Sequence, residues 1–98
     1  MRLGYSQVSL TWVANVTGHY IANARACGRD DWQNVLTSTL TELGKRYADN
    51  TLSSFVQSVK QEVEITPGRN ATKKALAEWQ AMHARALTTL RRENQQSK

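Results

Sequence analysis

Apolar residues recur at helical spacing over residues 71–92, which is the clearest pattern in the chain. At about 100° per residue they fall on one stripe. The members of this stripe are Ala75, Leu76, Trp79, Met82, His83, Ala86, Leu87 and Leu90. Asn70 or Thr72 can cap the start of the helix. We therefore predict an amphipathic helix over 71–92.

Two further helices are predicted in the middle of the chain. The first begins at Asp30 or Asp31, keeps an apolar period to about Tyr47, and can be ended early by Gly44. The second follows Asp49, with its apolar face on Leu52, Phe55, Val56, Val59 and Val63. Its alternating tail, residues 61–66, could be extended instead.

The segment 7–17 fits two patterns. Val8, Leu10, Trp12, Ala14 and Val16 alternate with more polar positions, as in a strand. An equally good helical stripe covers Leu10, Val13, Thr17, Tyr20, Ile21 and Ala24. A lone strand would lack partners, so a helix is favoured, with Gly18 as a weak point or break and Gly28 as its C-cap.

Four helices with short connections predict an all-α fold, a small bundle with a basic amphipathic C-terminal helix. At 98 residues the chain is one compact domain, in which residues 1–68 form a scaffold and residues 69–98 form an arm. We expect the polar tail, residues 93–98, to fray.

The charge is divided in the same place. Six bases are matched by six acids up to Gly68, whereas seven bases face two acids from Arg69 onward, so the arm carries the whole net charge of +5. The five bases on the predicted helix (Lys73, Lys74, Arg85, Arg91 and Arg92) lie opposite the apolar stripe, with Ala77, Ala81, Ala84 and Thr88 between them. The candidate binding residues for an anionic partner are Arg69, Lys73, Lys74, Arg85, Arg91 and Arg92. Phosphates of DNA or RNA and an acidic protein surface fit this face equally well.

Three other features could serve binding. A helix-turn-helix could span Leu40 to Val63, although it offers no arginine for guanine. Trp12, Val8 and Val16 form a second apolar stripe, which is either a buried face or an exposed anchor for a protein partner. Thr66, Pro67 and Gly68 form a turn that could also act as a cis/trans hinge, on which a host prolyl isomerase could act.

Catalysis and membrane insertion have little support in the sequence. No zinc spacing, dinucleotide-binding motif or P-loop occurs, so we expect neither an enzyme nor a bound metal or cofactor. His83 lies on the core stripe and is expected to be structural. No apolar run is long enough to span a membrane. The single cysteine and the absence of a signal segment favour the cytoplasm.

The small size, the basic arm after Thr66-Pro67-Gly68 and the lack of catalytic motifs resemble the anti-RecBCD proteins of lambdoid phages, a family of small basic inhibitors. The similarity is one of size, charge and the single proline hinge. It implies binding to the RecBCD nuclease of the host, in the host cytoplasm, and a change in its recombination activity; only the hinge at Pro67 carries over.

These observations lead to one principal hypothesis. The chain is expected to be a phage- or plasmid-type accessory protein that binds and inhibits a host nucleic-acid-processing complex. Direct binding of DNA or RNA, and a self-associating structural bundle, are the alternatives.

Overall fold

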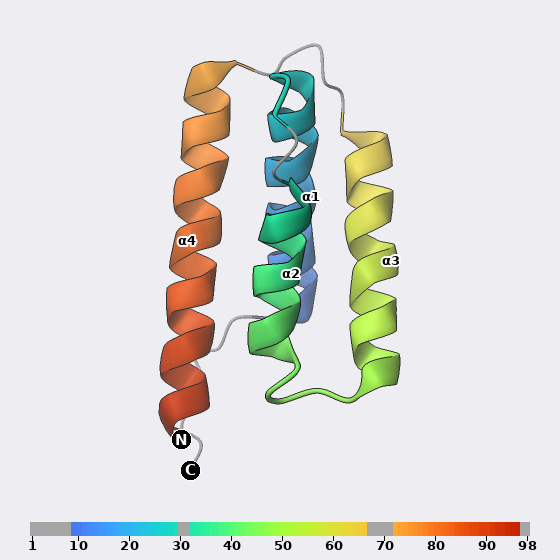
Figure 1. Ribbon diagram of the computed structural model, residues 1–98, viewed down its shortest axis with the longest axis vertical. Coiled ribbons are helices and arrows are strands. Elements are labelled where there is room, and N and C mark those ends of the chain that lie inside the picture. The colour runs from blue at the N-terminus through green and yellow to red at the C-terminus, as the bar shows by residue number, and fades with distance from the viewer. Residues whose placement is uncertain (1–8, 30–31, 67–71, 97–98) are drawn as a thin grey trace.

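The computed structural model describes residues 9–29, 32–66 and 72–96, which form four helices and, within those ranges, no strand. They are α1 (Leu10–Ala26), α2 (Trp32–Leu43), α3 (Asp49–Ile65) and α4 (Lys73–Gln96). The predicted all-α bundle is therefore confirmed. In Figure 1, α3 and α4 stand on either side of α1, and α2 lies in front of α1, so that the helices form a row of three with one helix laid over it.

Helix α1 is the centre of the bundle. It packs against each of the other three helices and is buried on almost every side between Val13 and Ala24. Ser9 caps it, since its Oγ accepts a hydrogen bond from the Trp12 amide at 3.1 Å. The helical interpretation of residues 10–17 is thus confirmed, and the strand alternative is wrong for them. Residues 7 and 8 lie outside the described part of the chain.

Gly18 does not break α1, contrary to the expectation from sequence. The absence of a side chain instead lets α3 pack closely here, because a Cβ placed on Gly18 would clash with the Cβ of Glu62. The backbones of the two helices approach closely at this point. A glycine inside a helix therefore reflects packing here.

The helix ends follow local rules. After α1, Gly28 adopts φ 81°, its amide donates to the carbonyl of Arg25, and the Arg29 amide donates to that of Ala24, which is a Schellman motif. The C-cap prediction at Gly28 is confirmed. Helix α2 ends at Leu43, so Gly44 does terminate it before Tyr47. The segment after Gln61 remains helical as far as Ile65.

Helix α4 is longer than its apolar stripe predicts. Of its two candidate caps, Thr72 takes the role, its Oγ1 accepting from the Ala75 amide at 3.0 Å, while Asn70 lies outside the described residues. The helix continues to Gln96. The expected fraying of residues 93–98 is not seen at Glu93 and Asn94, which bond to the rest of the bundle; residues 97 and 98 lie outside the described part of the chain.

One core joins the four helices. Leu43, Val59, Val13, Phe55 and Leu90 lie at its centre and are at most 4% exposed. Each helix thus contributes at least one fully buried apolar side chain. A smaller cluster of Tyr20, Ala24 and Leu76 lies between α1 and α4.

Candidate interaction surface on α4

The inner face of α4 holds this helix firmly against the bundle. Leu76, His83, Ala86 and Leu90 are all buried, at intervals of three, four and seven residues. They span about 21 Å of the helix axis at 1.5 Å per residue. The outer face is therefore fixed in orientation along most of its length, rather than carried on a loose arm.

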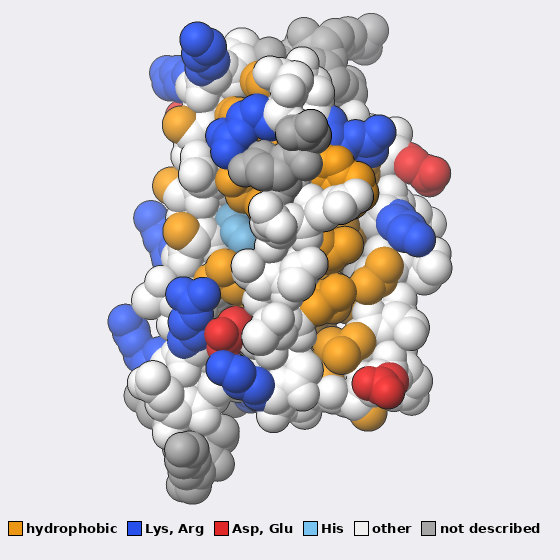
Figure 2. Space-filling view, viewed as in Figure 1, with side chains coloured by type: hydrophobic (Ala, Val, Ile, Leu, Met, Phe, Trp, Pro, Cys, Tyr) orange, Lys and Arg blue, Asp and Glu red, His pale blue; other side chains and the backbone are white. Residues whose placement is uncertain are grey.

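Four of the predicted cations lie free on the outer face. Lys73, Lys74, Arg85 and Arg92 are exposed, and none of them makes an ion pair within the part of the chain that the structure describes. Figure 2 shows Lys and Arg side chains spaced along the α4 side of the molecule. The residues between them, Ala77, Ala81, Ala84 and Thr88, are exposed as predicted. We call this set of eight residues the α4 cationic face.

Arg91 behaves differently from the other bases of α4. Its Nε donates to the carboxylate of Glu42 on α2 at 3.3 Å, although 55% of its side chain remains exposed. Lys45 and Asn94 donate to the same carboxylate at 3.4 and 3.2 Å. Within the bundle Arg91 is thus a clamp between α4 and α2, and it is set apart from the unpaired cations; its predicted role in binding a partner stays a prediction.

Glu42 is the acceptor at the centre of this clamp and is only 7% exposed. Burial by itself raises the pKa of its carboxyl group. The hydrogen bonds from Arg91, Lys45 and Asn94 outweigh burial and bring that pKa below 4.5. Glu42 is therefore ionised at neutral pH and holds the C-terminal part of α4 in place.

A second clamp explains the other bases near the α2–α3 turn. Arg46 donates to Glu93 of α4 at 2.8 Å. Lys45 and Arg46 thus hold α4, although they precede the turn of the hypothetical helix-turn-helix. Helices α2 and α3 also run antiparallel (Figure 1), whereas a helix-turn-helix pair crosses at about 90–120°. The geometry does not support groove reading by α3.

His83 is a buried member of the core. Its Nε2 lies 2.8 Å from Oγ1 of Thr39, which donates its single proton to the carbonyl of Val35. The hydroxyl must therefore accept from Nε2, so the neutral ring carries its proton there. Burial lowers the pKa of His83 to about 4. The ring is uncharged at neutral pH, in keeping with a structural role.

A polar cluster on the opposite side of α1 was not predicted. His19 stacks on Trp79 of α4, with ring centroids 4.4 Å apart, and its Nδ1 lies 2.8 Å from the Asn15 carbonyl. Asn15 also donates from its side chain to Glu62 of α3. The cluster ties α1 to both flanking helices. A signal existed in the sequence, since Asn15 and His19 stand four residues apart on one side of a helix.

The remaining predicted residues are not gathered into one site. Val16 is 1% exposed and belongs to the core, whereas Trp12 is 39% exposed, so the expected apolar anchor does not form a continuous exposed stripe. Thr66 caps α3, its hydroxyl donating to the Glu62 carbonyl at 2.6 Å. The predictions for Val8, Pro67, Gly68 and Arg69 fall outside the described residues.

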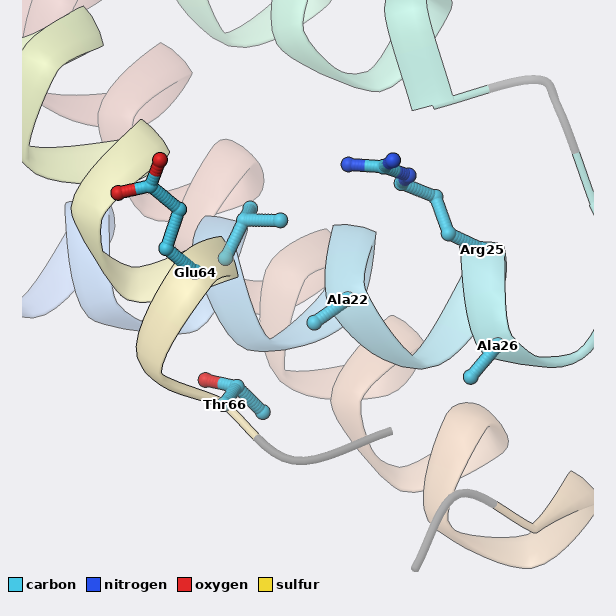
Figure 3. A pocket seen from close by; sticks show the side chains of 6 residues that line it. Ala22, Arg25, Ala26, Glu64 and Thr66 are labelled. Carbon is cyan, nitrogen blue, oxygen red and sulfur yellow. The ribbon is translucent and has the colours of Figure 1, made fainter. Parts of the chain in front are cut away.

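One open hollow lies near the ends of α1 and α3. Ala22, Arg25, Ala26, Glu64 and Thr66 surround it (Figure 3), and Arg25 extends toward α3 while the Glu64 carboxylate points away from it. Among the described residues, no group of His, Cys, Asp and Glu side chains could hold a metal ion. Nor is any described helix long and apolar enough to cross a membrane.

The fold and surface together define a small all-α bundle with a rigid cationic helix face. Comparison with protein-family models, curated proteins and solved structures finds no match to this chain.

Proposed function

We propose that this chain is an interaction protein that docks through the α4 cationic face on a polyanionic surface of a nucleic-acid-processing complex and inhibits that complex. The observation that carries the proposal is the contrast among the bases. The bases of the α2–α3 turn, and Arg91, pair with Glu42, which is buried, or with Glu93, which is largely buried. Lys73, Lys74, Arg85 and Arg92, by contrast, are exposed without an ion pair in the described chain. These four are available to a partner.

The shape of the face supports close approach of a broad surface. At about 100° per residue, the alanines and Thr88 form a low strip, with Lys73 on one side and Lys74, Arg85 and Arg92 on the other. Lys74 and Arg92 are 18 positions apart, or about 27 Å along the axis. Because the helix is already ordered, little conformational entropy is lost when the cations meet their partner.

The proposed target is the RecBCD nuclease, which is what the resemblance in size, charge and proline position implies. The test is inhibition of purified RecBCD on linear duplex DNA. A triple variant with Lys73→Gln, Lys74→Gln and Arg85→Gln should need about tenfold more protein for the same inhibition, because rigid electrostatic contacts are lost.

The chain offers a control matched in charge. Gln33, Ser38 and Gln61 are exposed on α2 and α3, so the triple Gln33→Glu, Ser38→Glu and Gln61→Glu lowers the net charge by the same three units away from α4. This control should inhibit like the unaltered protein. Equal losses in both triples would show that net charge alone matters, and no loss in the first triple would refute the role of α4.

Direct binding of duplex DNA or RNA is the second candidate, favoured by the exposed cations on both sides of the low strip. Phosphate contacts release counterions, so affinity should fall steeply with salt, and neutralising three contacts should reduce the slope by about 3. Gel retardation of a 30-bp duplex at 50–200 mM salt checks this. Absence of retardation at low salt, together with retained RecBCD inhibition, would reject this candidate and leave the first.

A further inference from the structure

A groove runs between α2 and α3, on the face opposite the His19 cluster. Both helices pack on α1, but they are not in close contact with each other. The floor and walls of the upper part are largely apolar, with a hollow of about 260 Å³ lined by Ile21, Trp32, Leu36, Val59 and Val63. A second hollow lies lower down, between Leu40 of α2 and Leu52 and Val56 of α3. Figure 2 shows apolar side chains gathered along this line.

The arrangement has the shape of a vacant helix position. Helices α4, α1 and α3 form a row, and α2 lies over that row toward α4 (Figure 1). A helix placed beside α2 would rest on α1 and α3 and would bury the apolar lining. Helix α2 has 12 residues, so the groove is about 18 Å long, which suits a partner helix of three to four turns.

The charged residues at the two ends of the groove favour one direction for that helix and acidic residues at its start. Arg25 and Lys60 line the upper end, and neither makes an ion pair within the described residues; the guanidinium of Arg25 lies 5.8 Å from the centre of the Trp32 ring. Glu64 lines this end too, but its carboxylate points away from Arg25 (Figure 3). The lower end carries Asp49.

The dipoles of α1 and α3 act in the same sense, whereas α2 begins at this end and would lie parallel to the bound helix. Helices α1 and α3 both end at the upper end of the groove, at Ala26 and Ile65, so their negative C-terminal ends lie there. A helix that starts at this end is antiparallel to both. Carboxylates in its first turn would face Arg25 and Lys60, and would also favour its own N-terminus.

We propose that the α2–α3 groove binds an amphipathic helix of a partner protein, with an apolar stripe on Ile21, Leu36, Val59 and Val63 and acidic residues in its first turn beside Arg25 and Lys60. This inference goes beyond the proposed function, since it concerns a different surface and does not involve the α4 cationic face.

Two synthetic peptides test the proposal. Both are labelled 16-residue amphipathic helices with leucines at positions i, i+3, i+4 and i+7; one carries glutamates in its first turn and the other lysines. Fluorescence anisotropy at low salt should show the glutamate peptide binding about tenfold more tightly. The double variant Arg25→Glu, Lys60→Glu should reverse that preference, and Leu36→Ser should weaken both peptides.

Control measurements separate loss of binding from loss of folding. Circular dichroism establishes that each variant is folded, and Val63→Ser replaces Leu36→Ser if the latter is not. The double variant Lys73→Glu, Lys74→Glu, away from the groove, should keep the preference for glutamate. Equal affinity for the two peptides, or no binding at millimolar peptide, would overturn the proposal. A dimer in sedimentation equilibrium that Leu36→Ser dissociates would also overturn it, because a second copy of the chain would then occupy the groove.

Discussion

Acidification should destabilise the bundle through His83 before any buried carboxylate is protonated. The ring is 5% exposed and its pKa lies near 4 in the folded chain, against an ordinary value of 6.5. Above pH 6.5 the ring is neutral in both states, and its contribution to stability is complete. Between pH 6.5 and 4 the unfolded chain binds a proton that the folded chain refuses, so stability falls as the pH falls.

The size of the effect follows from the shift. A difference of about 2.5 units at 1.36 kcal/mol per unit amounts to about 3 kcal/mol when the pH has reached 4. At pH 5 the loss is already about 2 kcal/mol. Since small domains are stable by only about 5–15 kcal/mol, this loss is readily measured.

Glu42 acts in a lower range of pH. Its folded pKa is below the ordinary 4.5, so its stabilisation is complete above pH 4.5 and is lost only as the pH falls further, through its folded pKa. Urea unfolding followed by circular dichroism at pH 7.5, 6.0 and 5.0 therefore measures the histidine with little contribution from this carboxylate.

His83→Gln is the matched variant, since the amide can still donate to Thr39 but cannot ionise. This substitution should lower stability at pH 7.5 by about 1 kcal/mol, because the amide differs in shape from the ring. The stability of the variant should then fall much less between pH 7.5 and 5.0 than that of the unaltered protein. His19→Gln should retain that decline. An unchanged decline in His83→Gln, or an NMR titration of His83 near pH 6.5, would refute the reasoning.

Two further predictions concern contacts between helices. Gly18→Ala should destabilise the protein by about 1–3 kcal/mol despite the higher helix propensity of alanine, because the new Cβ would meet Glu62. Urea unfolding measures this change. A gain in stability would show that α1 and α3 can separate without cost. Glu42→Gln should lower the free energy of unfolding by about 1 kcal/mol at pH 7, because it removes the charge-assisted hydrogen bonds to Arg91 and Lys45. The difference in stability between this variant and the unaltered protein should shrink below pH 4.5. A difference that stays constant with pH would contradict the ionised state of Glu42.

The helices could be predicted because their signals are local. The stripe from Leu76 to Leu90, the glycine after α1 and the threonine before α4 are all patterns within one turn or one period. The N-terminal ambiguity arose because Val8 to Val16 fits both periods. Tertiary packing resolves this ambiguity, since α1 is surrounded by three helices and needs apolar residues on more than one side.

The clamps could not be predicted in the same way, because their partners stand far apart in sequence. Arg91 shares the polar side of α4 with the free cations, and only the position of α2 brings it to Glu42, 49 residues earlier. One signal was present: Glu42 follows Val35 and Thr39 at helical spacing, so it is a carboxylate on an apolar stripe. Such a residue requires a charged partner.

The two proposed binding surfaces are separate in space. The α4 cationic face and the α2–α3 groove lie on different sides of α1, so one partner surface can contact α4 without covering the groove. Helix α3 contributes only Phe55 and Val59 to the fully buried core, and its backbone comes close to that of α1 but scarcely to those of α2 and α4. A helix bound in the groove would add a second support for α3, and binding to the folded state alone raises stability by mass action. The groove peptide should therefore raise the unfolding temperature, whereas a polyanion on α4, which is already anchored along its length, should change it less.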